Sequence, residues 1–272
     1  MNILISNDDG VYATGINILY DELKKNADVT VVAPDRERSA SSHSLTIDRP
    51  LRVNEVKPGV FSVDGTPTDA VSIAVHSILK KKPDIIISGI NYGGNICDDV
   101  IYSGTVSAAM EGAIMGIKSI AVSLVVNKGG GYLPKDPSLE ENLELSFKKS
   151  AEFVWNLARA VHNGAHLPNT LLNVNIPQTI ITKLPEHCFD YRITRQGKRH
   201  FEDYIVENID PRGRKYYWIW GKNITFEEIT GSDYEAVHSG LISISPIHLD
   251  MTNYNAMDKL KNMDFSLKHD KS

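Results

Sequence analysis

The sequence is poor in cysteine and in long apolar runs. Cys97 and Cys188 are its only cysteines, and they lie far apart in a chain of 272 residues. This spacing excludes a cysteine-built zinc site and fits a reducing compartment. No apolar run reaches the roughly 20 residues that a membrane-spanning helix needs. The first residues lead directly into a predicted strand, without a charged leader region, so we expect a cytoplasmic protein with no membrane partner.

The chain also lacks an excess of basic residues. It has 29 Lys and Arg against 34 Asp and Glu, which gives a formal net charge of -5 and a pI of about 6.0. We therefore expect no duplex nucleic acid partner, because few cations are available to displace counterions from phosphates. The hydrophobic fraction of 42% is ordinary for a globular protein with a sizeable core.

Short apolar segments alternate with amphipathic ones in the first part of the chain. The apolar segments are rich in β-branched residues, as is typical of strands buried on both faces. This alternation predicts an α/β fold with a doubly wound, mostly parallel sheet. The predicted strands are 2–6, 29–33, 84–88, 119–125 and 171–175, with a hairpin at 51–56 and 60–63 and helices near 16–25, 66–82, 105–116 and 139–161.

The pattern changes after about residue 177. Segments 191–195, 216–220 and 241–245 read as strands without helices between them. We therefore expect a core over residues 1–176 and a smaller β-rich extension over 177–272. Within it, we expect an arm around residues 200–225 that packs on another subunit and buries the alternating aromatic residues Tyr216, Trp218 and Trp220.

Polar loops follow three of the predicted strands. Asp8 and Asp9 come directly after the first strand, residues 39–44 follow the second, and residues 91–103 follow the strand at 84–88. Because the carboxyl ends of parallel strands meet at one edge of a sheet, these loops are expected to converge. Their oxygen donors suit Mg²⁺ or Mn²⁺. The simpler alternative is that the two acids only form a turn before Gly10.

The segment "YSGTVSAAMEG" adds a second chemical feature. It places Ser103, Gly104 and Thr105 at the start of a helix, with Ser103 as the predicted N-cap. Free backbone N–H groups and the positive end of the helix dipole form a natural phosphate seat, although ordinary capping explains the same residues. Beside a hard-cation site, this helix start favours attack on a phosphate ester.

Five segments in unbroken order resemble the signature segments of the SurE family, the survival protein E nucleotidases. They are "ILISNDDGVYATGI", "VVAPDRERSASSHSLT", "GTPTDAVSIAV", "SGINYGGN" and "DDVIYSGTVSAAMEG", and they cover most of residues 1–125. The resemblance implies a Rossmann-like core and a metal-dependent phosphatase, a 5′-nucleotidase that acts on nucleoside 5′- and 3′-monophosphates. Short polyphosphate is a further candidate substrate. It also implies one Mg²⁺ or Mn²⁺ per subunit and a homodimer or homotetramer.

The resemblance extends to individual site residues. It implies that the metal ligands are Asp8, Asp9, Ser39 and Asn91, and that the phosphate contacts are Asn95, Ser103, Gly104 and Thr105, with His43 nearby. Asp8 and Asp9 are also the expected catalytic residues, since one of them would handle a proton or orient the attacking water. Whether Asp8 is a nucleophile or a base stays open. Gly94 stands where the family often has a proline.

Two other classes of α/β protein fit the sequence less well. Receiver domains also carry an acidic pair after the first strand, but the strand at 84–88 ends in Ser-Gly-Ile-Asn, with no Asp to accept a phosphate. A nicotinamide dehydrogenase would need a G-x-G-x-x-G loop where Asn7-Asp8-Asp9-Gly10 stands. The remaining alternative is a receiver-like or metal-binding signalling protein without hydrolase activity.

Overall fold

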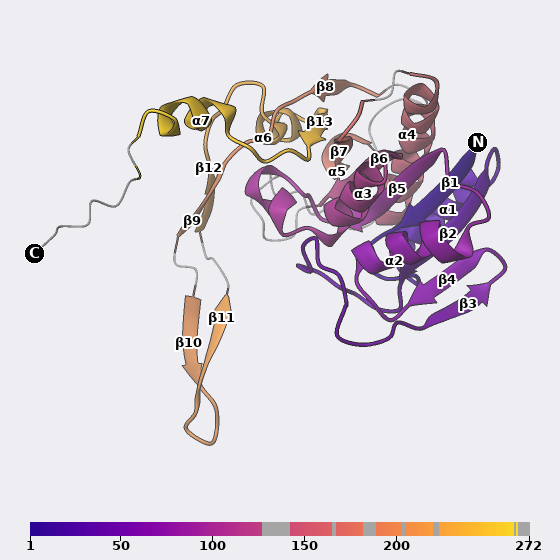
Figure 1. Ribbon diagram of the computed structural model, residues 1–272, viewed down its shortest axis with the longest axis horizontal. Helices are drawn as coiled ribbons and strands as arrows, with labels where there is room; N and C mark the ends of the chain where they lie inside the picture. Colours follow the sequence, from indigo (N-terminus) through magenta and orange to yellow (C-terminus); the bar gives the residue numbers. More distant parts are fainter. Residues whose placement is uncertain are drawn as a thin grey trace, which may run out of the picture.

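The fold is built on one large mixed sheet. The computed structural model describes residues 1–126, 142–164, 167–181, 189–202, 205–219, 223–263 and 265. Within these residues, nine strands form a sheet in the order β3-β4-β2-β1-β5-β6-β7-β13-β8 (Figure 1). The strands are β1 (Asn2–Ser6), β2 (Asp28–Pro34), β3 (Val53–Lys57), β4 (Val60–Val63), β5 (Ile85–Tyr92), β6 (Lys118–Val125), β7 (Thr170–Pro177), β8 (Tyr191–Ile193) and β13 (Ile242–His248).

Most neighbouring strands in this sheet are parallel. The strands from β4 to β7 in the sheet order pair in parallel, whereas β3 is antiparallel to β4 and β13 is antiparallel to β7. The β3–β4 pair is the predicted hairpin. The buried strands are those that the β-branched runs predict, because such side chains pack well on both faces of a pleated sheet.

Helices cover both faces of the sheet. Ile3 and Ile5 of β1 point into a core formed with α1 (Thr14–Leu23) and α4 (Leu143–Asn163). Leu4, between them, points into a second core formed with α2 (Pro67–Ile73) and α3 (Gly104–Ile114). Because successive side chains on a strand face opposite sides, the two helix pairs lie on opposite faces. The predicted α/β fold with a doubly wound, mostly parallel sheet is confirmed.

A capping box explains where one of these helices begins. Thr66 caps α2 in a reciprocal capping box with Asp69, and Pro67 occupies the first turn. The predicted helix over 66–82 is shorter in the structure, because α2 passes into a π-helical turn, Ala74–Ile78, and ends there. The predicted start of α4 at residue 139 lies outside the described residues, and the helix is seen from Leu143.

The C-terminal part departs from the prediction in one respect. The predicted strands at 191–195, 216–220 and 241–245 correspond to β8, β11 (Lys215–Ile219) and β13, although Trp220 lies outside the described residues. The prediction that no helix lies between them is wrong. Helix α6 (Asp233–His238) precedes β13, and α5 (Gln178–Ile181) and α7 (Tyr254–Leu260) are also present.

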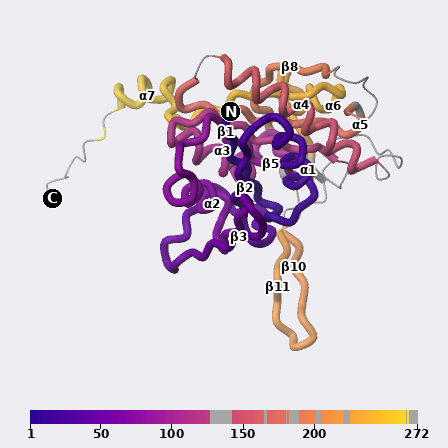
Figure 2. Tube along the Cα trace, turned by 90° about the vertical axis from the view of Figure 1, so that its right-hand side faces the viewer, coloured from indigo at the N-terminus to yellow at the C-terminus, as the bar shows by residue number. Residues whose placement is uncertain are grey.

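A hairpin projects from the rest of the molecule. Strand β9 (Arg199–Glu202) pairs with β12 (Asn223–Phe226), and β10 (Ile205–Ile209) pairs with β11, both antiparallel. In Figures 1 and 2 the β10–β11 hairpin stands away from the sheet and its helices. In this chain Trp218 on β11 is 64% exposed and Tyr216 is 43% exposed, so both aromatic side chains are available for a contact.

Among the residues that the structure describes, no helix has the length and apolar character needed to cross a bilayer.

Candidate active site

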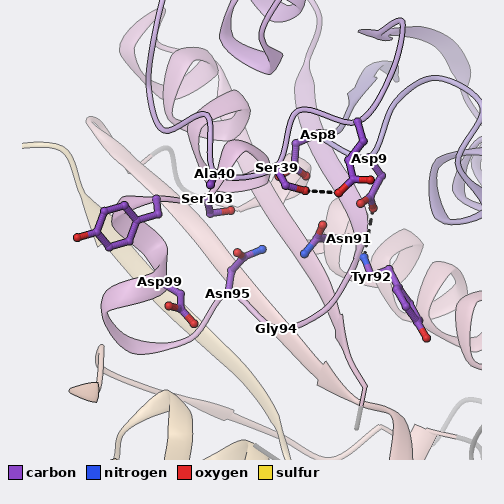
Figure 3. Close-up of a pocket in the computed structure, with 12 residues that line it drawn as sticks. Asp8, Asp9, Ser39, Ala40, Asn91, Tyr92, Gly94, Asn95, Asp99 and Ser103 are labelled. Atoms are coloured by element: carbon purple, nitrogen blue, oxygen red, sulfur yellow. Dashed lines mark hydrogen bonds between the residues drawn. The ribbon is translucent and has the colours of Figure 1, made fainter. Parts of the chain in front are cut away.

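A polar cavity lies where the carboxyl ends of β1, β2 and β5 meet. Its volume is about 410 Å³. The loops after these three strands all contribute to its lining, as expected for the carboxyl edge of a parallel sheet. The cavity brings together most of the predicted site residues, namely Asp8, Asp9, Ser39, Asn91, Asn95 and Ser103 (Figure 3).

The turn after β1 is held by residues other than the two acids. The Asn7 side chain donates to the Gly10 carbonyl at 3.0 Å and accepts from the Gly10 N–H at 3.2 Å. Gly10 has a φ of +98°, a conformation that favours glycine, and an added Cβ would lie 3.0 Å from the backbone of Arg36. The turn alone therefore does not account for the carboxylates of Asp8 and Asp9, which are left to line the cavity.

Asp8 is the more enclosed of the two acids. Only 5% of the residue is exposed, and its carboxylate accepts a short hydrogen bond from the Thr105 hydroxyl. Burial raises the pKa of Asp8, and the hydrogen bonds from Thr105 only partly oppose this rise. Thr105 at the start of α3 thus holds the Asp8 carboxylate in one orientation.

Asp9 lies beside Asp8 and feels its charge. The Asp9 carboxylate accepts from the backbone N–H of Tyr92 at 3.2 Å. Burial and then the negative charge of Asp8 raise the pKa of Asp9 to about 6. The charge of Asp8 thus disfavours the charged form of Asp9, and a bound cation would offset this effect.

Neutral oxygen donors stand next to this acidic pair. The Ser39 hydroxyl donates to the Glu37 carboxylate at 2.7 Å. The Asn91 amide nitrogen donates to the Gly93 carbonyl at 2.8 Å, which leaves its side-chain oxygen as the acceptor. Figure 3 shows Asn91 between Asp9 and Asn95. Its position follows an irregularity in the β5–β6 register between Ser88 and Asn91, a feature common beside active sites.

A cation at this position would be coordinated mainly by the acidic pair and by neutral oxygens. In the part of the chain that the structure describes, no three His, Cys, Asp or Glu side chains form a metal-binding group. Two carboxylates with a hydroxyl and an amide oxygen suit a hard cation that keeps several waters. The donor set of Asp8, Asp9, Ser39 and Asn91 therefore fits Mg²⁺ or Mn²⁺.

Asn95 is fixed by polar residues that the sequence analysis did not single out. Its amide nitrogen donates to the Ser123 hydroxyl at 2.8 Å, and its backbone N–H donates to the Asn175 side chain at 2.8 Å. Its carbonyl accepts from the side chains of Asn173 and Asn175 at 2.8 and 3.0 Å. Polar residues at alternate positions of the buried strand β7 were the available signal, since buried amides need partners.

The start of α3 reaches the acidic pair closely. Ser103 is the N-cap, as predicted, and its hydroxyl accepts from the Val106 N–H at 3.1 Å. A Cβ added to Gly104 would lie 2.7 Å from the Cβ of Asp8 and 2.8 Å from the Ser41 hydroxyl. Glycine is therefore required at this position for the helix to approach the β1 loop.

Two predicted phosphate contacts have other partners in the structure. The Thr105 hydroxyl is fully buried and points to Asp8 rather than into the cavity. The His43 ring lies 2.9 Å from the Glu111 carboxylate on α3 and does not line the cavity. A direct contact of either side chain with phosphate therefore stays a prediction that this geometry does not favour.

The cavity also contains acids that the sequence analysis did not assign. Glu37 and Asp99 line it, together with Tyr92 and Tyr102. The charge of Glu37 contributes to the raised pKa values of Asp8 and Asp9. Both acids lie in segments that carry the family resemblance, in "DRERS" and "DDV", and Asp99 also lies in the predicted polar loop at 91–103.

The fold and the cavity define an α/β protein with a polar cavity at the carboxyl edge of its sheet, where an acidic pair lies close to a helix start. Residues 3–203 match the family model described as survival protein SurE. The chain belongs to the SurE family, as the motifs predict.

Relatives match along nearly the whole chain. The 5′-nucleotidase SurE of Geobacter metallireducens is 47% identical over 266 residues, which cover 98% of both chains. The 5′-nucleotidase SurE of Geotalea uraniireducens is 48% identical, covering 98% of this chain and all of the relative. The crystal structure of the SurE protein from Aquifex aeolicus matches with a TM-score of 0.77 and 39% identity, over 96% of this chain and 98% of that one.

Proposed function

We propose that this chain is a metal-dependent phosphatase that hydrolyses nucleoside 5′- and 3′-monophosphates. The observation that carries the proposal is the close approach of the Asp8–Asp9 pair to the start of α3 within one cavity. In this arrangement a cation site lies next to an anion-binding site at a helix N-terminus, and phosphate ester hydrolysis uses both. The relatives described above are named 5′-nucleotidases, which supports the nucleotide as substrate.

In this proposal Asp8, Asp9, Ser39 and Asn91 hold one Mg²⁺ or Mn²⁺ per subunit. The raised pKa of Asp9 supports this assignment, because it reflects burial first and the adjacent charge of Asp8 second, and a bound cation would offset both. When bound, the divalent cation supplies positive charge to the phosphate and lowers the pKa of a coordinated water.

The chain's own residues orient the reacting groups. Ser103 and the backbone N–H of Gly104 receive the phosphate at the start of α3, and the Asn95 side chain lies on the same side of the cavity (Figure 3). Asp8 orients the attacking water, because the Thr105 hydroxyl fixes its carboxylate. Groups that are held in place before the reaction stabilise developing negative charge without reorganising, at about 3 kcal/mol for each well-placed donor.

Phosphate release from a panel of substrates tests this function. The panel contains AMP, GMP, 3′-AMP, short polyphosphate and a sugar phosphate, each assayed with Mg²⁺, with Mn²⁺ and with excess EDTA. We expect the nucleotides to be the better substrates and EDTA to abolish turnover. Full turnover in EDTA would contradict the metal site, and a strong preference for sugar phosphates would contradict the nucleotidase assignment. No release from any substrate would favour a metal-binding signalling protein.

We also propose that the chain assembles as a homodimer or homotetramer through the arm formed by β10 and β11. The exposed aromatic side chains of Tyr216 and Trp218 support this proposal, since such residues are enriched at the centres of protein interfaces. Ile205 and Ile209 on β10 are also more than half exposed, which enlarges the apolar surface of the arm.

A further inference from the structure

An acidic residue on one side of the cavity is paired with a cation from the C-terminal part of the chain. Asp99 lines the cavity on the side away from Asp9 (Figure 3). The Arg199 guanidinium, at the start of β9, forms a short ion pair with the Asp99 carboxylate. The two side chains are 13% and 21% exposed, so solvent screens this pair less than it screens a surface pair.

The cavity has a large excess of negative charge. Asp8, Asp9, Glu37 and Asp99 all line it, and none of the described residues that line it is Lys or Arg. The first two are the proposed cation ligands, whereas Asp99 comes from the short helix at Cys97–Ile101, after β5. An unpaired carboxylate at that position would repel a phosphate dianion.

We propose that Arg199 is a positioning residue that keeps the negative charge of Asp99 from opposing the substrate phosphate. This inference rests on the proposed phosphatase function. Arg199 acts through Asp99 and does not itself line the cavity. Its effect is therefore expected on phosphate affinity rather than on the chemical step.

Hydrogen bonds next to Arg199 hold the Arg199–Asp99 ion pair in place. The Arg199 N–H donates to the Asp98 carboxylate at 2.8 Å, and the Gln196 side chain donates to the Cys97 carbonyl at 2.9 Å. These bonds fasten the strand that leads into the arm to the short helix that precedes Ser103. The Ser103 N–H in turn donates to the Asp99 carbonyl at 3.1 Å, so the ion pair and the phosphate seat share one segment.

Four variants separate charge masking from a purely structural role. They are R199Q, D99N, the double variant D99N/R199Q, and K198Q as the matched control, since Lys198 pairs with Glu227 at the surface. The readouts are KM and kcat for AMP, and the dissociation constant of inorganic phosphate for the Mg²⁺-loaded protein. We expect R199Q to raise KM and the phosphate dissociation constant about tenfold, with little change in kcat.

The expected pattern across the variants is asymmetric. D99N should lower the phosphate dissociation constant, because Arg199 then adds positive charge near the cavity. The double variant should recover most of the affinity that R199Q loses, and added NaCl should reduce the R199Q defect because salt screens the repulsion. K198Q should behave like the unmodified protein.

Other outcomes would overturn the inference. If D99N is as damaging as R199Q, or if the double variant is no better than R199Q, the pair has only a structural role. Should R199Q not fold, an increase of KM in D99N alone still contradicts the proposal. If the unmodified protein binds phosphate but hydrolyses no nucleotide, the proposed function fails, while the phosphate affinities still test Arg199.

Discussion

Asp9 links the acidic pair to the stability of the protein. Its pKa of about 6 in the folded chain lies above the ordinary value of 3.8, so the folded state binds more protons than the unfolded state between these values. The contribution of protonated Asp9 to the free energy of unfolding is fully present below about pH 4 and is lost as the pH rises through 6.

The first prediction concerns this pH dependence in the absence of metal. Between pH 4 and 7 in EDTA, the melting temperature of the unmodified protein should fall relative to that of Asp9→Asn, because Asn does not titrate. Thermal unfolding of both proteins at each pH measures the difference. A difference that does not change with pH would show that burial and the charge of Asp8 do not raise the pKa of Asp9 as described.

The second prediction concerns Thr105. Thr105→Val removes the hydroxyl that orients Asp8 and keeps the shape of the side chain. We expect kcat and metal affinity to fall by about 10- to 100-fold, as for other groups that orient a metal ligand. Thr105→Ser keeps the hydroxyl and should retain most of the activity. Unchanged kinetics in Thr105→Val would rule out this positioning role.

More of the cavity residues than of their hydrogen-bond partners could be predicted from the sequence. Asp8, Asp9, Ser39 and Asn91 could be placed because each follows a recognisable strand. The hydrogen bond between Thr105 and Asp8 could not be predicted, because it depends on how closely α3 approaches the loop after β1. Thr105 and Asp8 are 97 positions apart in the sequence. Such long-range contacts leave no local pattern.

At the scale of elements, the position of the start of α3 depends on Gly104, which has no side chain. Gly104→Ala would normally favour a helix, since Ala has the higher helix propensity. Here the added Cβ would lie 2.7 Å from Asp8, so the helix start must move away from the β1 loop.

The third prediction follows from this contact. We expect Gly104→Ala to lower both the melting temperature and the phosphatase rate, the latter by at least about tenfold, because the anion seat shifts by a fraction of an ångström. Ile114→Ala, at the exposed other end of α3, is the control and should keep the rate. Wild-type activity in Gly104→Ala would show that the close approach is not needed.

The same scale shows which elements a sequence can predict. Strands such as β1 and β6 are short, largely apolar segments that contain β-branched residues, and α2 carries a capping box, so these elements have local signals. Helix α6 has only six residues, too few for an apolar stripe to repeat. The place of β13 beside β7 was equally hidden, since pairing between distant strands is decided by the whole sheet.

At the scale of the whole molecule, the projecting arm concerns assembly. The fourth prediction is that the chain is oligomeric in solution and that Tyr216→Ser with Trp218→Ser shifts it toward the monomer. The reason is that the two exposed rings would lose a large apolar contact area. Arg212→Ser, in the turn of the same hairpin, is the control. Light scattering at micromolar concentration measures the mass, and a monomeric unmodified protein would contradict the arm's role.

The acidic pair is the centre of the whole account, and Asp8→Asn tests it most directly. Asn keeps an oxygen that can accept from Thr105, so the fold should persist, and the melting temperature in EDTA should stay the same or rise. Metal affinity and phosphate release from AMP should both fall by at least about a hundredfold, since one charge is removed from the cation site. Ser39→Ala should be milder, because a water can replace a neutral hydroxyl. An Asp8→Asn protein that releases phosphate at a rate near that of the unmodified protein would contradict the proposed site and its mechanism.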